Sequence, residues 1–257
     1  MQTPVHILAT VRKPELLKAA LLVFRTLRVG FPTQPVFVWG NGLDADSAAV
    51  LANVAAGRGA QFRNIPATSH DAWIEKCVSA LNEPFWILDT DVVFFAPMEI
   101  CKLGAFAGRY EPAFNEEFTD TIHVARLHTA VMWIDPAGLR CEMRKWMAKI
   151  PAPWRDSAQF ALLRQNFVPQ ATGGTLFYDT MAGCYQAFGE DHGWEFQERD
   201  NEAFEHIHCA TYADEVVKQA PSLKHLQLVH DRVYANPAEG RGLAKAQAEY
   251  YASRKPK

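Results

Sequence analysis

The sequence is poor in cysteine, and its cysteines form no paired motif. The 257-residue chain has five, far apart and with no Cys-x-x-Cys: Cys77, Cys101, Cys141, Cys184 and Cys209. This pattern argues against a disulfide framework or a zinc site and predicts thiols in a reducing compartment. No run approaches the roughly 18 apolar residues of a membrane span, and the first apolar stretch is too short for a signal peptide. We expect a cytoplasmic protein without a transmembrane segment.

An excess of positive charge is also missing. The chain has 26 Lys and Arg against 29 Asp and Glu, a formal net charge of −3. Nucleic-acid-binding surfaces normally show a basic excess, so no nucleic-acid partner is expected. No Gly-x-Gly-x-x-Gly follows the first apolar stretch, and no Gly-x-x-x-x-Gly-Lys-(Ser/Thr) occurs. These absences argue against a dinucleotide cofactor and against a P-loop enzyme.

The most informative stretch is 85–95, where apolar and aromatic residues run into two carboxylates, Asp89 and Asp91, and out again. A continuous apolar run of this kind predicts a strand buried on both faces of a parallel sheet. Asp is a poor strand residue and is rarely buried without a partner. Alternation places both carboxylates on one side of an extended backbone. The stretch therefore predicts a site where two carboxylates converge on a divalent cation.

Strand and helix patterns alternate through the first ~100 residues with short connections, which predicts a parallel sheet covered by helices on both faces. Strands are expected at 5–11, 36–39, 61–65 and 85–95, with helices between them, Asp44 or Asp46 and Ser69 serving as caps. Ligands of such sheets bind at the carboxyl ends of the strands. Thr10, Arg12 and Asn41 fall at those ends, as do the two carboxylates.

The second half has a different texture. Residues 104–121 mix Gly, Pro, Asn and acids with aromatics, which predicts a long functional loop. A strand is predicted at 127–134, and Asp135-Pro136 then begins a helix. Further elements are expected at 156–163 (helix), 179–188 (helix capped by Asp179), 205–210 (strand), 226–230 (strand or helix) and 243–252 (surface helix). With no repeat or linker, we expect one domain over 1–257.

Over residues 4–210 this order of parts resembles that of glycosyltransferases with the GT-A fold. The matching parts are a strand ending in Asp89-Thr90-Asp91, the strand 129–135, a helix opened by Asp156 and Gln159, and a late histidine in His206-Ile207-His208. Two parts depart: His128-Thr129-Ala130 replaces the usual Asn-(Ser/Ala)-Gly, and no Gly-x-x-Lys-Pro-Trp follows the late histidine. The resemblance implies an α/β GT-A fold with a Rossmann-like, mixed, mainly parallel sheet flanked by helices. About 1–100 would bind the nucleotide and about 101–257 the acceptor.

The resemblance also implies a chemistry. A nucleoside-diphosphate sugar, with UDP as the default, would donate its sugar to an unknown sugar, lipid or protein acceptor, and Mn²⁺ or Mg²⁺ would stabilise the leaving diphosphate. Asp91 would bind the metal and Asp89 the donor or the metal. His208 would be the third ligand, with His206 and His230 as rivals. The resemblance further implies that the donor is bound by Thr10, Arg12, Asn41 and Lys76. It implies that Asp156 and Gln159 handle the donor sugar or the acceptor. The predicted catalytic residues are therefore Asp89, Asp91, Asp156 and Gln159.

Three other interpretations fit parts of the chain. The haloacid-dehalogenase motif, an apolar strand then Asp-x-Asp-x-(Thr/Val), would make Asp89 the nucleophile of a phosphohydrolase, but three strand–helix units precede it here. Nucleotidyltransferases share the sheet and acid pair, but their Gly-rich loop is absent. A non-catalytic sugar-nucleotide-binding relative would look the same. If the enzyme inverts the anomeric configuration it needs a base, and the sequence does not rank the four candidates: Glu111, Glu116, Glu117 and Asp120.

Overall fold

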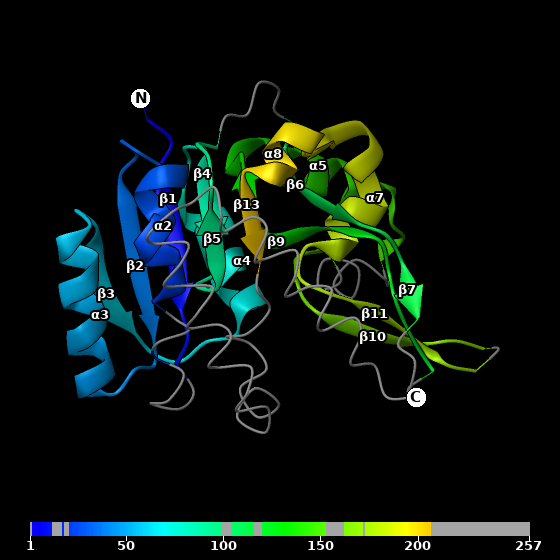
Figure 1. Ribbon diagram of the computed structural model, residues 1–257. Helices are drawn as coiled ribbons and strands as arrows, with labels where there is room; N and C mark the ends of the chain where they lie inside the picture. Colours follow the sequence, from blue (N-terminus) through cyan, green and yellow to red (C-terminus); the bar gives the residue numbers. More distant parts are fainter. Residues whose placement is uncertain are drawn as a thin grey trace, which may run out of the picture.

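The computed structural model describes residues 2–11, 17, 21–98, 104–115, 120–152, 162–171 and 173–206. A seven-stranded sheet forms the centre (Figure 1). Its strands, in spatial order, are β12 (Gly193–Glu195), β6 (Phe106–Glu111), β9 (Arg126–Ile134), β4 (Phe85–Leu88), β1 (Val5–Ala9), β2 (Val36–Asn41) and β3 (Gln61–Ile65). Strand β9 is antiparallel to β4 and β6, while the other neighbouring pairs are parallel. The predicted α/β class with a mixed, mainly parallel sheet is confirmed.

Two smaller sheets and six helices complete the described part of the chain. A four-stranded sheet has the order β10 (Asn166–Pro169), β11 (Thr175–Tyr178), β8 (Thr121–His123), β7 (Phe114–Asn115), and a two-stranded sheet pairs β13 (Phe204–His206) with β5 (Val92–Phe94). The helices are α2 (Leu22–Gly30), α3 (Ala45–Gly57), α4 (His70–Ala80), α5 (Pro136–Lys149), α7 (Ala182–His192) and α8 (Glu198–Glu202). In Figure 1 the four-stranded sheet lies on the opposite side of the molecule from β3 and α3.

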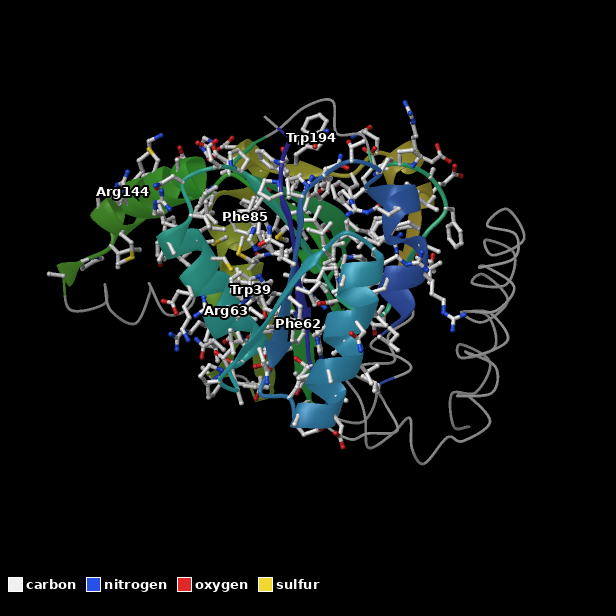
Figure 2. All side chains as sticks on the ribbon, turned by 90° about the vertical axis from the view of Figure 1, so that its left-hand side faces the viewer. Trp39, Phe62, Arg63, Phe85, Arg144 and Trp194 are labelled. Atoms are coloured by element: carbon white, nitrogen blue, oxygen red, sulfur yellow. The ribbon has the colours of Figure 1, made fainter. Side chains whose placement is uncertain are left out.

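The core is divided by the central sheet into two hydrophobic clusters. Strand β1 supplies both, with Val5, Ile7 and Ala9 in one cluster and Leu8 in the other. The first cluster contains the apolar faces of α2 and α3, and the second those of α4, α5 and α7. Figure 2 shows α2 and α3 on one side of the sheet and α4 and α5 on the other. Because both faces are covered, β4 is apolar along its whole length, and β1 is apolar except for the buried His6.

Helix starts follow the predicted capping chemistry in part. The Asp44 side chain accepts a hydrogen bond from the Ser47 amide at the start of α3. Asp135 accepts from the Ala137 amide, and Pro136 occupies the first turn of α5. These caps satisfy amides that have no partner inside the helix. Ser69 is the N-cap residue of α4 without a side-chain capping bond. The helix predicted to be capped by Asp179 begins later, behind Met181.

The stretch 85–95 is not one strand, and this prediction was wrong. Strand β4 ends at Leu88, the chain turns at Thr90 and Asp91, and β5 begins at Val92 in a different sheet. The turn is fixed by backbone bonds: the Asp89 amide donates to the Ala130 carbonyl, and the Val23 amide donates to the Thr90 carbonyl. The poor strand propensity of Asp locates the break. The apolar residues after it are buried against α2 instead of continuing the central sheet.

The predicted long loop at 104–121 is also corrected. Residues Phe106–Glu111 form β6 inside the central sheet, and Phe114–Asn115 begin the four-stranded sheet as β7. A run of only three buried residues, Phe106, Ala107 and Gly108, is too short to predict a strand by periodicity. It becomes one because β9, a distant segment, pairs with it. Glycine fits at 108 because a Cβ there would lie 3.2 Å from the His128 carbonyl oxygen.

Several predicted elements lie outside the described residues: those at 156–161, 207–210, 226–230 and 243–252. Strand β13 confirms the start of the one predicted near 205. Within the described ranges, no helix has the length and apolar character that crossing a membrane requires. Three cysteines of this part, Cys77, Cys141 and Cys184, are free thiols, as predicted.

Candidate functional site

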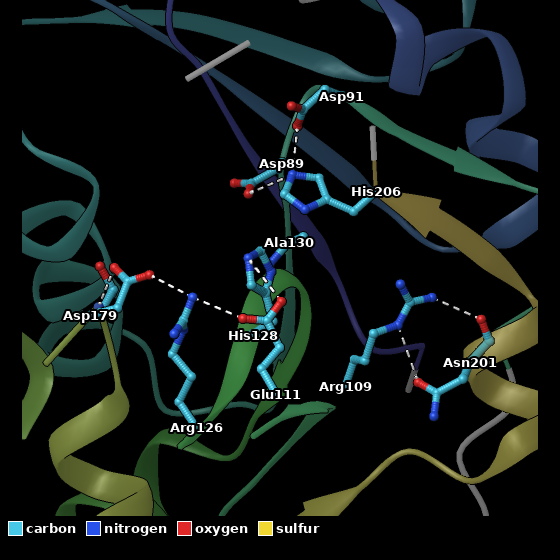
Figure 3. A network of polar contacts seen from close by, with 11 residues as sticks. Asp89, Asp91, Arg109, Glu111, Arg126, His128, Ala130, Asp179, Asn201 and His206 are labelled. Carbon is cyan, nitrogen blue, oxygen red and sulfur yellow. Dashed lines mark hydrogen bonds and ion pairs between the residues drawn. The ribbon is translucent and has the colours of Figure 1, made fainter. Parts of the chain in front are cut away.

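Two carboxylates and one imidazole converge at the carboxyl end of β4 (Figure 3). His206 Nε2 lies 3.2 Å from Asp91 Oδ1 and 3.8 Å from Asp89 Oδ2. One ligand atom from each of the three side chains lies within 4.8 Å of the others. We call Asp89, Asp91 and His206 the acid–histidine triad. It lies at the strand end where α/β sheets bind their ligands.

Pairing between distant segments brings the triad together. The turn after β4 places the two aspartates between the central sheet and β5. Strand β13 pairs antiparallel with β5, and His206 is directly opposite Val92, the residue after Asp91. This register sets which residue of β13 meets the carboxylates. His208, the predicted third ligand, and His230 lie outside the described residues, so their roles stay predictions.

Two members of the triad are deeply buried, the Asp89 side chain is 23% exposed, and the charges of the three shift one another. Asp91 is 1% exposed and His206 8%. Burial raises the pKa of Asp89 and the nearby charge of Asp91 raises it further, while His70 and His206 oppose the shift. Burial lowers the pKa of His206, but the charges of Asp91, Asp89 and Glu111 and the hydrogen bond to Asp91 outweigh it, so the net shift is upward. Without a bound cation, the two carboxylates therefore favour the protonated form of the His206 imidazole.

The donor set fits a divalent cation. Carboxylate oxygens are ligands for both Mg²⁺ and Mn²⁺, and an imidazole nitrogen is better tolerated by Mn²⁺. Two close, buried carboxylates repel each other, and a dication at the point where they converge would remove that repulsion. His70, at the start of α4, adds a second imidazole: its Nε2 lies 3.7 Å from Asp89 Oδ1. Asp89 thus stands between two histidines, one on each side.

A second charged cluster lies beside the triad and is centred on Arg126 (Figure 3). Arg126 Nη2 lies 2.8 Å from Glu111 Oε2 and 3.2 Å from Asp179 Oδ2. His128 Nε2 lies 3.7 Å from Glu111 Oε1. The Arg126 side chain is 8% exposed, whereas those of Glu111 and Asp179 are 26% and 25% exposed. We call Glu111, Arg126 and Asp179 the arginine cluster; a buried guanidinium holds two carboxylates that solvent can reach.

A small cavity of about 10 Å³ joins the two clusters. Its walls include His206 of the triad and Glu111 of the arginine cluster, with His128 between them. The rings of His128 and His206 have centroids 4.8 Å apart. Burial raises the pKa of Glu111, opposed by the charges of Arg126 and His206. The cavity has room for about one water molecule, so Glu111 and His206 border a shared space.

Arg109 holds the strand that carries His206. Its Nη2 donates to the carbonyls of Asn201, at 2.8 Å, and Phe204, at 2.9 Å. The guanidinium also lies 4.2 Å from the centre of the Phe204 ring, a cation–π contact. An irregularity in the β6–β9 pairing falls between Gly108 and Arg109. Such bulges redirect side chains, and this one turns Arg109 toward β13.

Two of the predicted donor-site residues, Thr10 and Asn41, form hydrogen bonds within the protein. Asn41 Nδ2 donates to Thr10 Oγ1 and to the Thr68 carbonyl, and the Thr68 amide donates to Asn41 Oδ1. Thr10 and Asn41 thus meet at the predicted sheet edge and secure the loop before α4. Lys76 is exposed on α4, six residues from His70 and so nearly two turns from the triad. Arg12, Asp156 and Gln159 lie outside the described residues.

Sequence reasoning missed His70, Arg126 and Asp179 as site residues. His70 stands at the first position of α4, and a helix start after a predicted strand was a usable signal. Arg126 and Asp179 lie 53 residues apart and meet only in the folded chain. Among the candidate bases, the structure brings Glu111 to the site, while Glu116 and Glu117 are not described. Asp120 directly precedes β8 of the four-stranded sheet, where its carbonyl accepts a hydrogen bond from the Thr175 amide.

Comparison with known proteins finds similar solved structures. No protein-family model matches the sequence, and no curated protein matches it. The chain is similar to the glycosyltransferase GlyE of Streptococcus pneumoniae TIGR4, at 8% identity and a TM-score of 0.46, over 78% of this chain and 46% of GlyE. It is also similar to the apo structure of the bifunctional glycosyltransferase WbbM, at 8% identity and a TM-score of 0.46, over 76% of this chain and 38% of WbbM. A third similar structure is the galactosyltransferase LgtC in complex with donor and acceptor sugar analogs. Its identity is 12% and its TM-score 0.38, over 57% of this chain and 64% of LgtC.

This chain spans less than two thirds of the length of each of these structures. The fold class predicted from the sequence is supported by the chain's own topology, since the central sheet is mixed, mainly parallel and flanked by helices. Identities of 8–12% and TM-scores below 0.5 carry no argument about activity. The function proposed below therefore rests on the geometry of the site.

Proposed function

We propose that this chain is a metal-dependent glycosyltransferase that uses a nucleoside-diphosphate sugar, with UDP as its nucleotide. The observation that carries the proposal is the acid–histidine triad at the carboxyl end of β4, buried and with converging ligand atoms. An oxygen-rich site with one imidazole suits a divalent cation that binds a diphosphate, Mn²⁺ in particular. The Asp-x-Asp order of the two acids, which motivated the resemblance, supports the same reaction.

Each described residue then has a defined role. Asp89, Asp91 and His206 would hold Mn²⁺ or Mg²⁺, and the bound metal would stabilise charge on the departing diphosphate. His70 orients Asp89 from the opposite side. Thr10 and Asn41 shape the sheet edge on which the nucleotide would lie. Donor or acceptor contacts by Arg12, Lys76, Asp156 and Gln159, and metal binding by His208, remain part of the proposal.

We further propose one catalytic domain over 1–257, with a nucleotide-binding half at about 1–100 and an acceptor-binding half after it. Two features support this division. The parallel strands β1 to β4 with α2, α3 and α4 all precede the triad. The arginine cluster, by contrast, is built from β6, β9 and the residue after β11. The two halves would meet at the triad, where His206 of the second half lies 3.2 Å from Asp91 and 3.8 Å from Asp89 of the first.

The proposal is tested by calorimetric titration with UDP, GDP and inorganic phosphate, each with and without Mn²⁺. The variants are Asp91→Asn and, as a matched control, Glu83→Gln, an exposed carboxylate just before the other end of β4. We expect Mn²⁺-dependent binding of one nucleoside diphosphate to the wild type and to Glu83→Gln, and none to Asp91→Asn. Asparagine keeps the shape of the side chain, so the loss would report on charge and not on packing.

Other results would point to the alternative interpretations. Mg²⁺-dependent binding of phosphate without nucleotide preference would replace the glycosyltransferase by a phosphohydrolase with Asp89 as nucleophile. Nucleotide binding that persists without metal and in Asp91→Asn would contradict the assigned role of the triad. Nucleotide-sugar binding without any turnover of the donor would indicate a non-catalytic relative.

A further inference from the structure

A row of aromatic rings crosses the four-stranded sheet. Its members are directly opposite one another in the strand registers: Phe167 faces Phe177, Phe177 faces His123, and His123 faces Phe114. Successive ring centroids lie 4.6, 4.9 and 4.3 Å apart. We call these four residues the aromatic row. Residues opposite each other in register share one face of a sheet, so the row is a continuous strip on one side.

The aromatic row is open to solvent. Phe167 is 64% exposed and Phe114 46% exposed, among the most exposed large apolar side chains of the described chain. No residue of the four strands is buried. The neighbouring register row, Val168 to Ile122, lies on the opposite face. Contiguous apolar surface of this kind on a folded domain marks a binding site.

Three members of the aromatic row lie only two or three residues along the chain from the three members of the arginine cluster. Phe114 follows Glu111 by three residues, His123 precedes Arg126 by three, and Phe177 precedes Asp179 by two. Since an extended chain spans at most about 3.6 Å per residue, each of these pairs is separated by no more than about 7–11 Å between Cα atoms. The cluster in turn shares a cavity with His206. The arginine cluster thus lies close both to His206 of the triad and to the aromatic row, and its two partly exposed carboxylates and the row are taken together as one surface.

We propose that this surface binds a saccharide and that the acceptor of the reaction is therefore a carbohydrate chain. The chemistry is complementary. Carboxylates held by a guanidinium accept hydrogen bonds from hydroxyl groups, and aromatic rings pack against the C–H face of a pyranose. The acceptor hydroxyl would lie at Glu111 and Asp179, next to the triad, and the following sugar units would lie on the aromatic row. This inference rests on the proposed function and adds the class of acceptor to it.

The charge of the surface favours a neutral saccharide over other occupants. Glu111 and Asp179 bring two carboxylates to one guanidinium. A nucleic acid or an anionic membrane would meet repulsion there. A purely apolar partner would leave the carboxylates without hydroxyl or amide donors, which is costly on burial. A neutral, hydroxyl-rich chain satisfies both parts of the surface.

The test is a glycan array of neutral oligosaccharides probed with the full chain in the presence of Mn²⁺ and UDP. Phe167→Ala and Phe114→Ala are compared with Val168→Ala and Ile122→Ala, which alter neighbouring positions on the opposite face of the same strands. We expect the wild type and the opposite-face variants to bind the same glycans. Each aromatic-row variant should bind them about tenfold more weakly, the order expected for one lost aromatic contact.

The outcomes separate this inference from the proposed function. The titration of UDP and Mn²⁺ is repeated on all four variants, and unchanged values show that the donor site and the fold are intact. Intact donor binding with no glycan signal, or with equal loss in both sets of variants, overturns the saccharide inference alone. Self-association that only the aromatic-row variants abolish would assign the surface to a second copy. Binding to neutral lipid vesicles in place of glycans would assign it to a membrane.

Discussion

The central sheet and the four-stranded sheet place their apolar side chains in opposite ways. Every residue of β1 and β4 is buried, and the side chains divide between two core clusters. In the four-stranded sheet no residue is buried, and the aromatic side chains of Phe167 and Phe114 are exposed to solvent. The first sheet therefore supplies stability and fixes the triad. The second contributes little to stability and presents a surface, so substitutions should separate the two functions.

The largest effect should come from truncating a side chain of the central sheet. Ile7, in the middle of β1, is 0% exposed and belongs to the core cluster that contains the buried apolar residues of α2 and α3. Ile7→Ala should lower the free energy of unfolding by about 2–5 kcal/mol, because it removes buried methyl groups and leaves a cavity. Urea denaturation followed by circular dichroism measures this. A loss well below this range would show that the core adjusts and that the contrast between the sheets is smaller than the burial indicates.

Metal binding should stabilise the fold through the triad. At about 100 times its dissociation constant, Mn²⁺ should raise the free energy of unfolding by about 2.7 kcal/mol, because it binds only the folded chain. Thermal unfolding with and without Mn²⁺ reports the change. In His206→Ala the same Mn²⁺ concentration should have almost no effect. Equal stabilisation of this variant would place the metal elsewhere.

Arg109 should affect metal binding without touching the metal. Since it holds β13 through two carbonyls, Arg109→Ala should free His206 from its position and weaken Mn²⁺ binding by about tenfold, at the low end for residues that orient ligands. Arg140→Ala is the matched control, because Arg140 also donates to backbone carbonyls, at Val78 and Leu81, far from the triad. Titration of Mn²⁺ into both variants checks this. Equal weakening would reveal a general loss of stability.

The contribution of His206 to the free energy of unfolding should fall with rising pH in the absence of metal and rise with pH when Mn²⁺ is bound. The pKa of His206 in the folded chain is raised above its ordinary 6.5. Without metal, the stability it contributes is fully present below pH 6.5 and is lost as pH rises through the folded pKa. Mn²⁺ requires the neutral imidazole, so stabilisation by Mn²⁺ should grow over the same interval. Urea titrations at several pH values, in EDTA and in Mn²⁺, measure both slopes. Slopes unchanged in His206→Gln would assign the effect to another group.

The smallest change in stability should follow truncation in the four-stranded sheet. Phe167 is 64% exposed, so Phe167→Ala should alter the free energy of unfolding by no more than about 0.5 kcal/mol, as for other surface positions. The same urea experiment as for Ile7→Ala makes the comparison direct. A loss of several kcal/mol would mean that the aromatic row is part of the core, and the distinction between the two sheets would fail.

Local patterns in the sequence predicted much of the nucleotide-binding half. The strands β1 to β4, the cap of α3 by Asp44 and the helix after Asp135 all depend on neighbouring residues. Periodicity and capping act over a few positions, so they can be read from the chain. The small strands of the second half escaped prediction. Their formation depends on partners far along the chain, as β6 depends on β9 and β11 on β8.

The sequence alone determined the α/β class and singled out Asp89 and Asp91, because an acidic pair inside an apolar run is a local signal. It could not choose between His206 and His208, which alternate onto the same side of a strand. Only the register of β13 against β5 places His206 beside the two carboxylates. Tertiary structure likewise decided the meeting of Glu111, Arg126 and Asp179. Contacts between distant segments depend on the packing of the whole chain, and no spacing in the sequence records them.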